Sequence, residues 1–535
     1  MKQILESLSM DKIYALIEST GELESHAKRH KLARPHVNIS EIKAGYSRIE
    51  QLMQELDKNR ALKSFLDDVF CHIPSLSISH IKQTESLQMH ELFELKSFLW
   101  NYVRLMEKLT AADMHMLHHM PDMSNLFKAL DPEANKLPVF RISPQYSPRL
   151  ATLLEQRQSL GNRLKETRAA DLQAAKQMLN MPSLKDEFVM PRSRQEAVTR
   201  LLSSKLFVVK SENLANYTFC LADTADALAI KQELNSLQLE ITDEETKVLH
   251  ELSKFVHANM PQLETAWHST VELCWDYMLS CFALKYGCCI PKVLDWNDNS
   301  FPGINLVSAV NLPLKLYLEA NHRSYQALDI SLSNAANLIT GPNMGGKSTA
   351  LITLGQICHL ASIGIPVPAK QAELPIYDSV YYNHDKGENS ENLSSFGREV
   401  IAFNAALQRK GRCLMLLDEF AKGTNPTEGE AICLAVIHYI SSSRHSLLAA
   451  THFSAPARLP GISHFSIKGI SEADFQRLQD TPDTDTKHRL RLLSEAMDYS
   501  LIALKGKGSP PQCAVKIAAI LGMPQEVLNH LNNKG

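Results

Sequence analysis

A glycine-rich stretch near the middle of the chain combines the residue types that bind phosphate. Gly341, Gly346, Lys347 and Ser348 follow the spacing Gly-x-x-x-x-Gly-Lys-Ser. In this pattern backbone N–H groups close around phosphate oxygens, the lysine reaches the β- and γ-phosphates, and the serine hydroxyl ligates Mg²⁺. Apolar residues on either side predict a strand before the loop and a helix after it, so we favour a nucleotide site over a chance glycine turn. The residues expected around the nucleotide are Gly341, Pro342, Asn343, Met344, Gly345, Gly346, Lys347, Ser348 and Thr349.

Two acidic residues follow another apolar run further along the chain. Residues 413–417 predict a buried strand that ends at Asp418 and Glu419. Asp418 is expected to hold Mg²⁺ through its water shell, and Glu419 is placed to polarise the attacking water. A third apolar run, residues 446–450, precedes His452, which either contacts the γ-phosphate or its water, or is a structural histidine. Combined with the phosphate loop, these residues predict an ATPase that depends on Mg²⁺.

The elements that must position these residues divide the chain into several parts. Its 535 residues are too many for one core. Residues 1–130 are expected to be a helical core, and residues 131–290 to be long lever helices with a small α+β insertion at about 180–223. Ser147 and Pro148 predict the start of the first lever. From residue 291, short apolar runs alternate with helices, which predicts a mostly parallel sheet. We place an α/β ATPase domain at 291–457 and an extension at 458–535.

Composition excludes some classes of protein. The hydrophobic content of 44% and charged content of 21% are those of an ordinary globular protein. A net charge of −3 does not support tight DNA binding by bulk electrostatics, although a local basic face remains compatible with it. No signal-peptide core or membrane-spanning run is found, so we expect a cytoplasmic protein without a membrane partner.

Neither the cysteines nor a group of histidines predicts a metal centre. The ten cysteines show no metal-ligand spacing, and we expect buried, reduced thiols. His115, His118 and His119 are close in sequence, but Pro121 separates them from the nearest downstream acid, Asp122. A loop or a packed helix end is the preferred interpretation.

Several of these motifs resemble those of the MutS family. Residues 340–349 look like the nucleotide loop of that family, and Asn392-Leu-Ser-Ser-Phe396 is similar to its Ser-Thr-Phe signature. Residues 418–429 resemble its Walker B strand and following loop, and residues 450–452 its histidine switch. The resemblance is specific over 291–457 and looser in the helices upstream.

The resemblance implies an ABC-type ATPase in which two protomers complete each other's sites. It implies that Ser394 or Ser395 contacts the γ-phosphate in trans, whereas an ordinary helix N-cap is the alternative for these serines. By the same resemblance, Tyr325 is a candidate to stack on adenine. Residues 510–529 resemble the family's C-terminal helix pair, which packs on the partner, so a homodimer is expected.

Departures from the family's mismatch-repair members leave two functions open. The Phe-x-Glu wedge, the length for a mismatch-reading domain, a large clamp and the nuclease-type (Smr) C-terminal module are not found in this sequence. The first function is ATP-switched DNA binding, on duplex or branched DNA, without classical mismatch reading. The second is remodelling of a protein client. Some short MutS-like ATPases are associated with reactivating adenosylcobalamin-dependent lysine aminomutase, and residues 130–133, 146–148 and 497–504 are reminiscent of that group.

Overall fold

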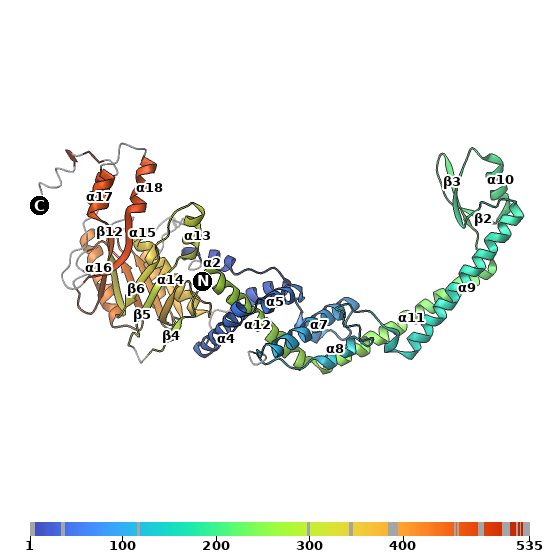
Figure 1. Cartoon of the computed structure of the whole chain (residues 1–535), viewed down its shortest axis with the longest axis horizontal. Helices are drawn as coiled ribbons and strands as arrows, with labels where there is room; N and C mark the ends of the chain where they lie inside the picture. The colour runs from blue at the N-terminus through green and yellow to red at the C-terminus, as the bar shows by residue number, and fades with distance from the viewer. Residues whose placement is uncertain are drawn as a thin grey trace. The chain divides into compact units, whose positions relative to one another are not determined.

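The computed structural model describes most of the chain. The described residues are 6–33, 38–114, 118–296, 300–341, 346–383, 394–453, 456, 459–479, 486–504, 514–520, 523–524 and 526–527. Within them, helices combine with three β-sheets, so the predicted mixture of helical and α/β regions is confirmed (Figure 1). The chain forms two compact units, one made of Met1–Cys71 and Val271–Gly535, the other of His72–Thr270.

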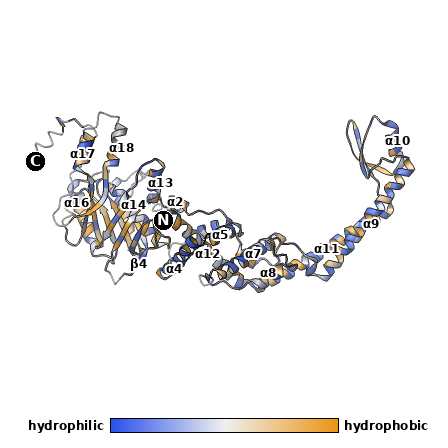
Figure 2. Ribbon diagram, viewed as in Figure 1, coloured by the Kyte–Doolittle hydropathy of each residue, from blue (hydrophilic) through white to orange (hydrophobic). Residues whose placement is uncertain are grey.

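The second unit is built around two long antiparallel helices. Helix α9 (Pro148–Leu179) starts where the sequence predicts, since the Ser147 hydroxyl accepts a hydrogen bond from the Leu150 N–H at 3.3 Å. Helix α11 (Ala225–Ala258) is capped by Thr224 in the same way. The two helices lie side by side, and Figure 2 shows hydrophilic and hydrophobic residues mixed along both. Their shared apolar seam comprises Leu150, Leu153, Leu237 and Ile241.

A small α+β insertion connects these two helices. Its elements are β1 (Glu187–Pro191), α10 (Gln195–Ser204), β2 (Phe207–Glu212) and β3 (Asn216–Leu221). The strands form an antiparallel sheet in the order β1-β3-β2. Phe219, in the central strand, is fully buried and packs with Leu201 of α10 and Ala175 of α9. The insertion thus has its own small apolar core.

Shorter helices make up the rest of this unit. They are α6 (Ile78–Gln83), α7 (Met89–Ala111), α8 (Ser124–Leu130) and the 3₁₀ turn η1 (Pro144–Tyr146). Of the three histidines close in sequence, His115 lies outside the described residues, and His119 accepts a hydrogen bond from Ser269 through its backbone carbonyl at 2.6 Å. Over the part of the chain that is described, no group of three or more His, Cys, Asp and Glu side chains is arranged to hold a metal ion.

The first unit contains a six-stranded sheet in the order β13-β12-β7-β11-β10-β9. Its strands are β7 (Ala336–Thr340), β9 (Ser379–Tyr382), β10 (Cys413–Asp418), β11 (Ser446–Ala450), β12 (Ser463–Ile470) and β13 (Met497–Ala503). All neighbours pair in parallel except β12 and β13. The parallel strands are buried on both faces, as expected for a sheet covered by helices.

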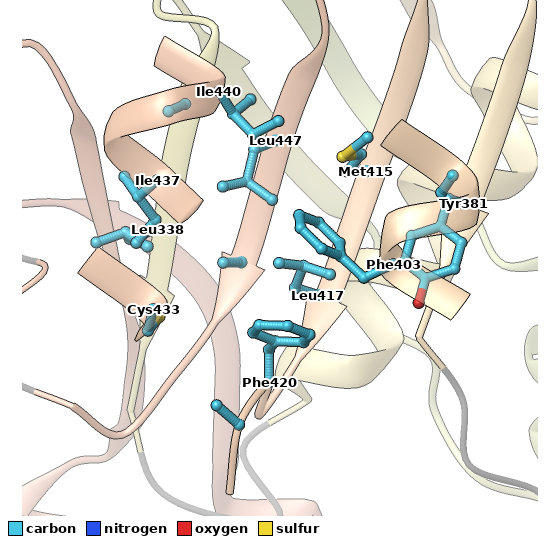
Figure 3. Packing of buried hydrophobic residues seen from close by; sticks show 14 of the residues in the cluster. Leu338, Tyr381, Phe403, Met415, Leu417, Phe420, Cys433, Ile437, Ile440 and Leu447 are labelled. Carbon is cyan, nitrogen blue, oxygen red and sulfur yellow. The ribbon is translucent and has the colours of Figure 1, made fainter. Parts of the chain in front are cut away.

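Helices cover the two faces of this sheet through different sets of residues. Helices α15 (Ser395–Leu407) and α16 (Pro426–Ser441) pack on one face, where Phe403 lies beside Leu417 of β10 and Ile437 lies beside Leu338 of β7 (Figure 3). Helix α14 (Lys347–Ser362) packs on the opposite face, because a Cβ at Gly355 would lie 2.6 Å from Leu416. Successive residues of β10 therefore point to opposite helix layers.

The remaining elements of the first unit surround this sheet. A second sheet in the order β4-β8-β5-β6 comprises β4 (Lys292–Leu294), β5 (Ile304–Ala309), β6 (Leu328–Leu332) and β8 (Gln371–Pro375). The N-terminal helices are α2 (Met10–Leu16), α3 (Glu22–Leu32), α4 (Ile39–Lys58) and α5 (Arg60–His72), and α12 (Met260–Tyr286) passes from one unit into the other. The others are α13 (Leu312–Ala320), α17 (Glu472–Gln479), α18 (Thr486–Ala496) and α19 (Ala514–Ile520). In the described chain, none of the helices has both the length and the apolar character needed to cross a membrane.

Candidate nucleotide-binding site

The described ends of the glycine-rich loop have backbone conformations that suit glycine. Strand β7 is buried throughout and leads to Gly341, whose φ is 138°. Gly346 has a φ of 87° and precedes α14, and a Cβ added there would lie 2.9 Å from Cδ1 of Tyr499. Pro342, Asn343, Met344 and Gly345 lie outside the described residues. The strand, glycine ends and helix follow in the order that the sequence predicts.

Lys347 lies at the start of α14 with only 5% of its surface exposed. Its Nζ donates to the carbonyl oxygen of Gly341 at 2.6 Å, across the mouth of the loop. Burial lowers the pKa of the Lys347 ammonium, and the carboxylates of Glu419 and Asp418 oppose that shift. These carboxylates are therefore close enough to interact electrostatically with Lys347. The start of α14 and the end of β10 thus lie near each other.

Asp418 is held at the end of β10 by residues at the end of the neighbouring strand β9. Its backbone N–H donates to Oδ1 of Asn383 at 2.5 Å, and the Nδ2 of Asn383 donates to the Asp418 carbonyl at 3.2 Å. The Tyr382 hydroxyl donates to the Asp418 carboxylate at 3.2 Å. Burial, followed by the charge of Asp418, raises the pKa of Tyr382, so this hydroxyl stays protonated as a donor.

Glu419 follows in a left-handed backbone conformation, with a φ of 52°. Its N–H donates to the Ala450 carbonyl at 2.9 Å, which ties it to the end of β11. Its carboxylate accepts a hydrogen bond from Lys422 at 2.5 Å. Burial alone would raise the pKa of Glu419, but Lys422, Lys347 and His452 together hold this pKa below its ordinary value. Glu419 is therefore ionised at neutral pH.

His452 lies in the loop after β11, with an exposed ring beside that of Phe453 at a centroid distance of 4.5 Å. The preceding residue, Thr451, donates its backbone N–H to the carbonyl of Ile339 at 3.1 Å, so β11 is tied to β7 just before the histidine. Since His452 contributes to the lowered pKa of Glu419, the two side chains share the same end of the sheet.

A cavity of about 850 Å³ opens at this end of the sheet. Lys347, Ser348, Asp418 and Glu419 line it together, although they come from two distant segments of the sequence. Ser348 and Asp418, the two residues predicted to serve Mg²⁺, thus face one space. The other residues predicted from the sequence that line it are Gly346, Thr349 and Tyr325.

Tyr325 lies in the wall of this cavity. Its hydroxyl accepts a hydrogen bond from the Asn311 N–H at 2.8 Å, and burial raises its pKa. This contact holds the ring in place while one side of it borders the cavity, which is compatible with the predicted role beside a base.

Residues from the C-terminal extension form a wall that the sequence did not predict. Tyr499 of β13 lines the cavity above Gly346, and its N–H donates to Gln326 at 2.8 Å. Arg323 donates to the hydroxyl of Ser494 at 2.6 Å, and both residues also line the cavity. No local pattern marks these residues, because they reach the site only through the antiparallel pairing of β12 with β13.

The two serines of the signature motif lie elsewhere. Ser394 is the N-cap of α15 and accepts a hydrogen bond from the Gly397 N–H at 3.1 Å. Both Ser394 and Ser395 are exposed, and neither is among the described residues that line the cavity of their own chain. The capping geometry considered as an alternative is therefore present at Ser394, and it leaves both serines accessible at the positive end of a helix.

Comparison with known proteins agrees with this arrangement. A family model described as MutS domain V matches residues 337–534. Endonuclease MutS2 of Caldanaerobacter subterraneus subsp. tengcongensis is 23% identical over 559 aligned positions, covering 99% of this chain and 63% of the relative. DNA mismatch repair protein MutS of Clostridium tetani is 22% identical over 96% of this chain and 57% of the relative. The corresponding protein of Leuconostoc mesenteroides subsp. mesenteroides is 27% identical over 55% of this chain and 32% of the relative.

These matches cover the region of the six-stranded sheet with a family model and most of the chain with more distant relatives. The sheet and its phosphate loop lie in the region that matches MutS domain V, and the relatives that align over nearly the whole chain are named MutS2 and MutS. The resemblance to the MutS family predicted from the sequence is thus confirmed. The chain spans less than two thirds of the length of each of these three relatives.

Proposed function

We propose that this protein is a Mg²⁺-dependent ATPase whose nucleotide site is the cavity at the end of the six-stranded sheet. The observation that carries the proposal is the meeting of Lys347, Ser348, Asp418 and Glu419 around one space of about 850 Å³. This volume is within the range of pockets that hold ligands of nucleotide size. The donor set fits the ion as well, because a hydroxyl and a carboxylate are the hard oxygen ligands that Mg²⁺ prefers.

The residues divide the work of phosphoryl transfer between them. Lys347 would neutralise charge on the β- and γ-phosphates, and Ser348 with Asp418 would hold the ion, which supplies further charge stabilisation. The ionised Glu419 would orient and polarise the attacking water, since its lowered pKa keeps it a hydrogen-bond acceptor. His452 would contact the γ-phosphate or its water, and Tyr325 would lie against the adenine.

The same site is proposed to be completed by a second copy of the chain. Ser394 and Ser395 are exposed at the N-terminus of α15 and lie outside their own chain's cavity, while backbone N–H groups at a helix N-terminus favour phosphate. A homodimer would place them against the partner's nucleotide. Mixing Lys347→Ala chains with chains carrying Ser394→Ala and Ser395→Ala should restore part of the activity, and no restoration would contradict a shared site.

The domain organisation that we propose follows from this shared ATPase site. They are a helical core at 1–130, levers at 131–290 with the insertion at about 180–223, the ATPase domain at 291–457 and an extension for dimerisation at 458–535. Closure of the two ATP sites would switch the levers between states that differ in affinity for DNA. Support for DNA comes from the relatives, whose names are DNA mismatch repair protein MutS and Endonuclease MutS2.

A protein client is the second candidate, and the insertion carries the observation that favours it. Val189, Val208 and Leu214 are exposed by 59%, 50% and 101%. Exposed apolar side chains of this kind are more typical of protein contacts than of phosphate contacts. The reactivating role on an adenosylcobalamin-dependent enzyme belongs to this candidate.

Two measurements, made one after the other, test the ATPase function and then the DNA function. Wild-type protein should hydrolyse ATP only with Mg²⁺, and Lys347→Ala should abolish turnover; unchanged hydrolysis would overturn the site.

Retention of duplex and branched DNA is then measured at graded salt with and without ATP, because contacts to phosphates weaken steeply as salt rises. If no DNA is retained at low salt in either state, the DNA function is wrong, and recovery of a cobalamin-dependent enzyme with the Glu419→Gln protein would favour the second candidate.

A further inference from the structure

The carboxylate of Glu399 joins helix α15 to the loop that follows β10. One oxygen, Oε2, accepts the backbone N–H of Ala421 at 3.0 Å, and Oε1 accepts Nδ2 of Asn383 at 2.7 Å. Asn383 in turn binds both backbone groups of Asp418. Glu399 lies about one helical turn after Ser394 and Ser395, so one side chain connects the signature helix with the residues of the acidic strand end.

The loop that Glu399 holds is conformationally demanding. Glu419 and Ala421 both have left-handed backbones, with φ values of 52° and 63°. The left-handed region is unfavourable for residues that carry a Cβ, so such conformations persist only where surrounding contacts hold them. The contact with the Ala421 N–H lies two residues from the catalytic candidate Glu419. Glu399 therefore restrains the part of the backbone that aims the Glu419 carboxylate.

We propose that Glu399 is a positioning residue that holds Asp418 and Glu419 of its own chain in the geometry for hydrolysis and fastens them to the signature helix. This inference rests on the proposed ATPase function. Glu399 is not among the described residues that line the nucleotide cavity, so it acts through Asn383 and the Ala421 backbone rather than on the substrate.

The chemistry of the two contacts predicts which substitution is damaging. The Nδ2 of Asn383 and the N–H of Ala421 are both donors, so the Glu399 side chain must offer them an acceptor from each oxygen. Glu399→Gln has the same shape, but its amide offers only one oxygen acceptor. Its NH₂ group would face one of the two N–H donors, so that hydrogen bond is lost. Glu399→Asp keeps two acceptors on a shorter stem, so its effect should be smaller than that of glutamine.

The experiment compares steady-state hydrolysis with nucleotide binding in these variants. For Glu399→Gln we expect kcat to fall by at least about tenfold, whereas the Kd for ATP and the KM stay within about twofold of the wild type, because the substituted side chain does not line the cavity and Asn383 keeps its hydrogen bonds to Asp418. Glu399→Asp should recover part of kcat. Glu373→Gln is the matched control, since it removes an exposed carboxylate that pairs with Lys292 at 3.1 Å, and it should change none of these constants.

Mixed dimers separate an effect on the own chain from an effect on the signature serines. When Glu399→Gln is placed in the chain with an intact Lys347, opposite a Lys347→Ala partner, activity should be lost. When Glu399→Gln is instead placed in the Lys347→Ala chain, the activity of the mixed dimers should equal that of the same mixed dimers without the Glu399→Gln substitution. The reverse pattern would show that Glu399 only supports the serines, and it would overturn the proposal.

Two further outcomes distinguish a failure of the positioning role from a failure of the proposed ATPase function. An unchanged kcat in Glu399→Gln, or a loss of ATP binding in proportion to the loss of turnover, would refute the positioning role while leaving the ATPase function intact. A wild-type protein that neither binds nor hydrolyses ATP would refute the proposed function itself, and the role of Glu399 would fall with it.

Discussion

The nucleotide cavity and the insertion at 180–223 both place a lysine near carboxylates, but in different environments. In the cavity, Lys347 is 5% exposed and shares its surroundings with Glu419 and Asp418. In the insertion, Lys210 and Glu187 pair at 2.6 Å with side chains that are 57% and 49% exposed. Exposed pairs contribute little to stability and are screened by water, whereas a buried lysine changes its pKa and polarises what binds to it.

The two regions differ in burial rather than in the number of charges, since burial lowers the pKa of Lys347, whereas the hydrogen bond to Glu187 raises the pKa of the exposed Lys210.

The largest effect should come from Glu419→Gln. Removing the carboxylate that orients the water is expected to lower ATP turnover by about a hundredfold or more, while ATP binding remains, because the amide keeps the shape of the side chain. Turnover is measured as phosphate release and binding as retention of labelled ATP. Hydrolysis within about twofold of the wild type would remove Glu419 from the proposed mechanism.

Gly346→Ala should weaken nucleotide binding by about five- to thirtyfold, since a left-handed residue with a Cβ costs about 1–2 kcal/mol. The new Cβ would also meet the ring of Tyr499 at 2.9 Å. The double variant with Tyr499→Ala should regain the part of the affinity that was lost to the clash, but not the part lost to backbone strain. Titration with a fluorescent ATP analogue measures both. Equal affinities of Gly346→Ala and the wild type would contradict the assigned geometry of the loop.

The pH dependence of hydrolysis should reveal the lowered pKa of Lys347. Since burial depresses this pKa from the ordinary 10.5, the lysine loses its charge as pH rises through a value below 10.5. The free-enzyme constant kcat/KM should therefore decline on an alkaline limb that begins below pH 10.5. Lys210, whose pKa is raised by its hydrogen bond to Glu187, provides the control, and Lys210→Met should leave the limb in place. A flat alkaline profile would contradict this account.

The smallest effect is expected in the insertion. Glu187→Gln removes an exposed ion pair and should shift the melting temperature by less than about 1 °C, because such pairs contribute little net stability. ATP turnover should not change. A shift of several degrees, seen by calorimetry, would mean that the insertion depends on this pair and that the contrast with the cavity is too simple.

Much of the site could be predicted from local sequence, because each motif sits at the end of its own buried strand. The glycine spacing before α14 and the acids after β10 are local features, and parallel strands bring their carboxyl ends to one edge. Helix starts such as Ser147 were equally predictable, since capping depends on neighbouring residues. Asn383, Glu399 and Tyr499 were not identified, because nothing in their immediate sequence distinguishes them from ordinary polar or aromatic residues.

Local sequence patterns predicted the proposed chemistry: a phosphate loop with its lysine, a pair of residues for Mg²⁺ and an acid to polarise water. They predicted these because the backbone of a strand, a glycine turn and a helix is specified over a few residues. The residues that enclose the cavity depend instead on how distant segments pack together. Pairing of β13 with β12 brings Tyr499 over Gly346, and packing of α15 brings Glu399 to Ala421. Such contacts join segments far apart in the chain, and their register depends on the whole core rather than on any local pattern.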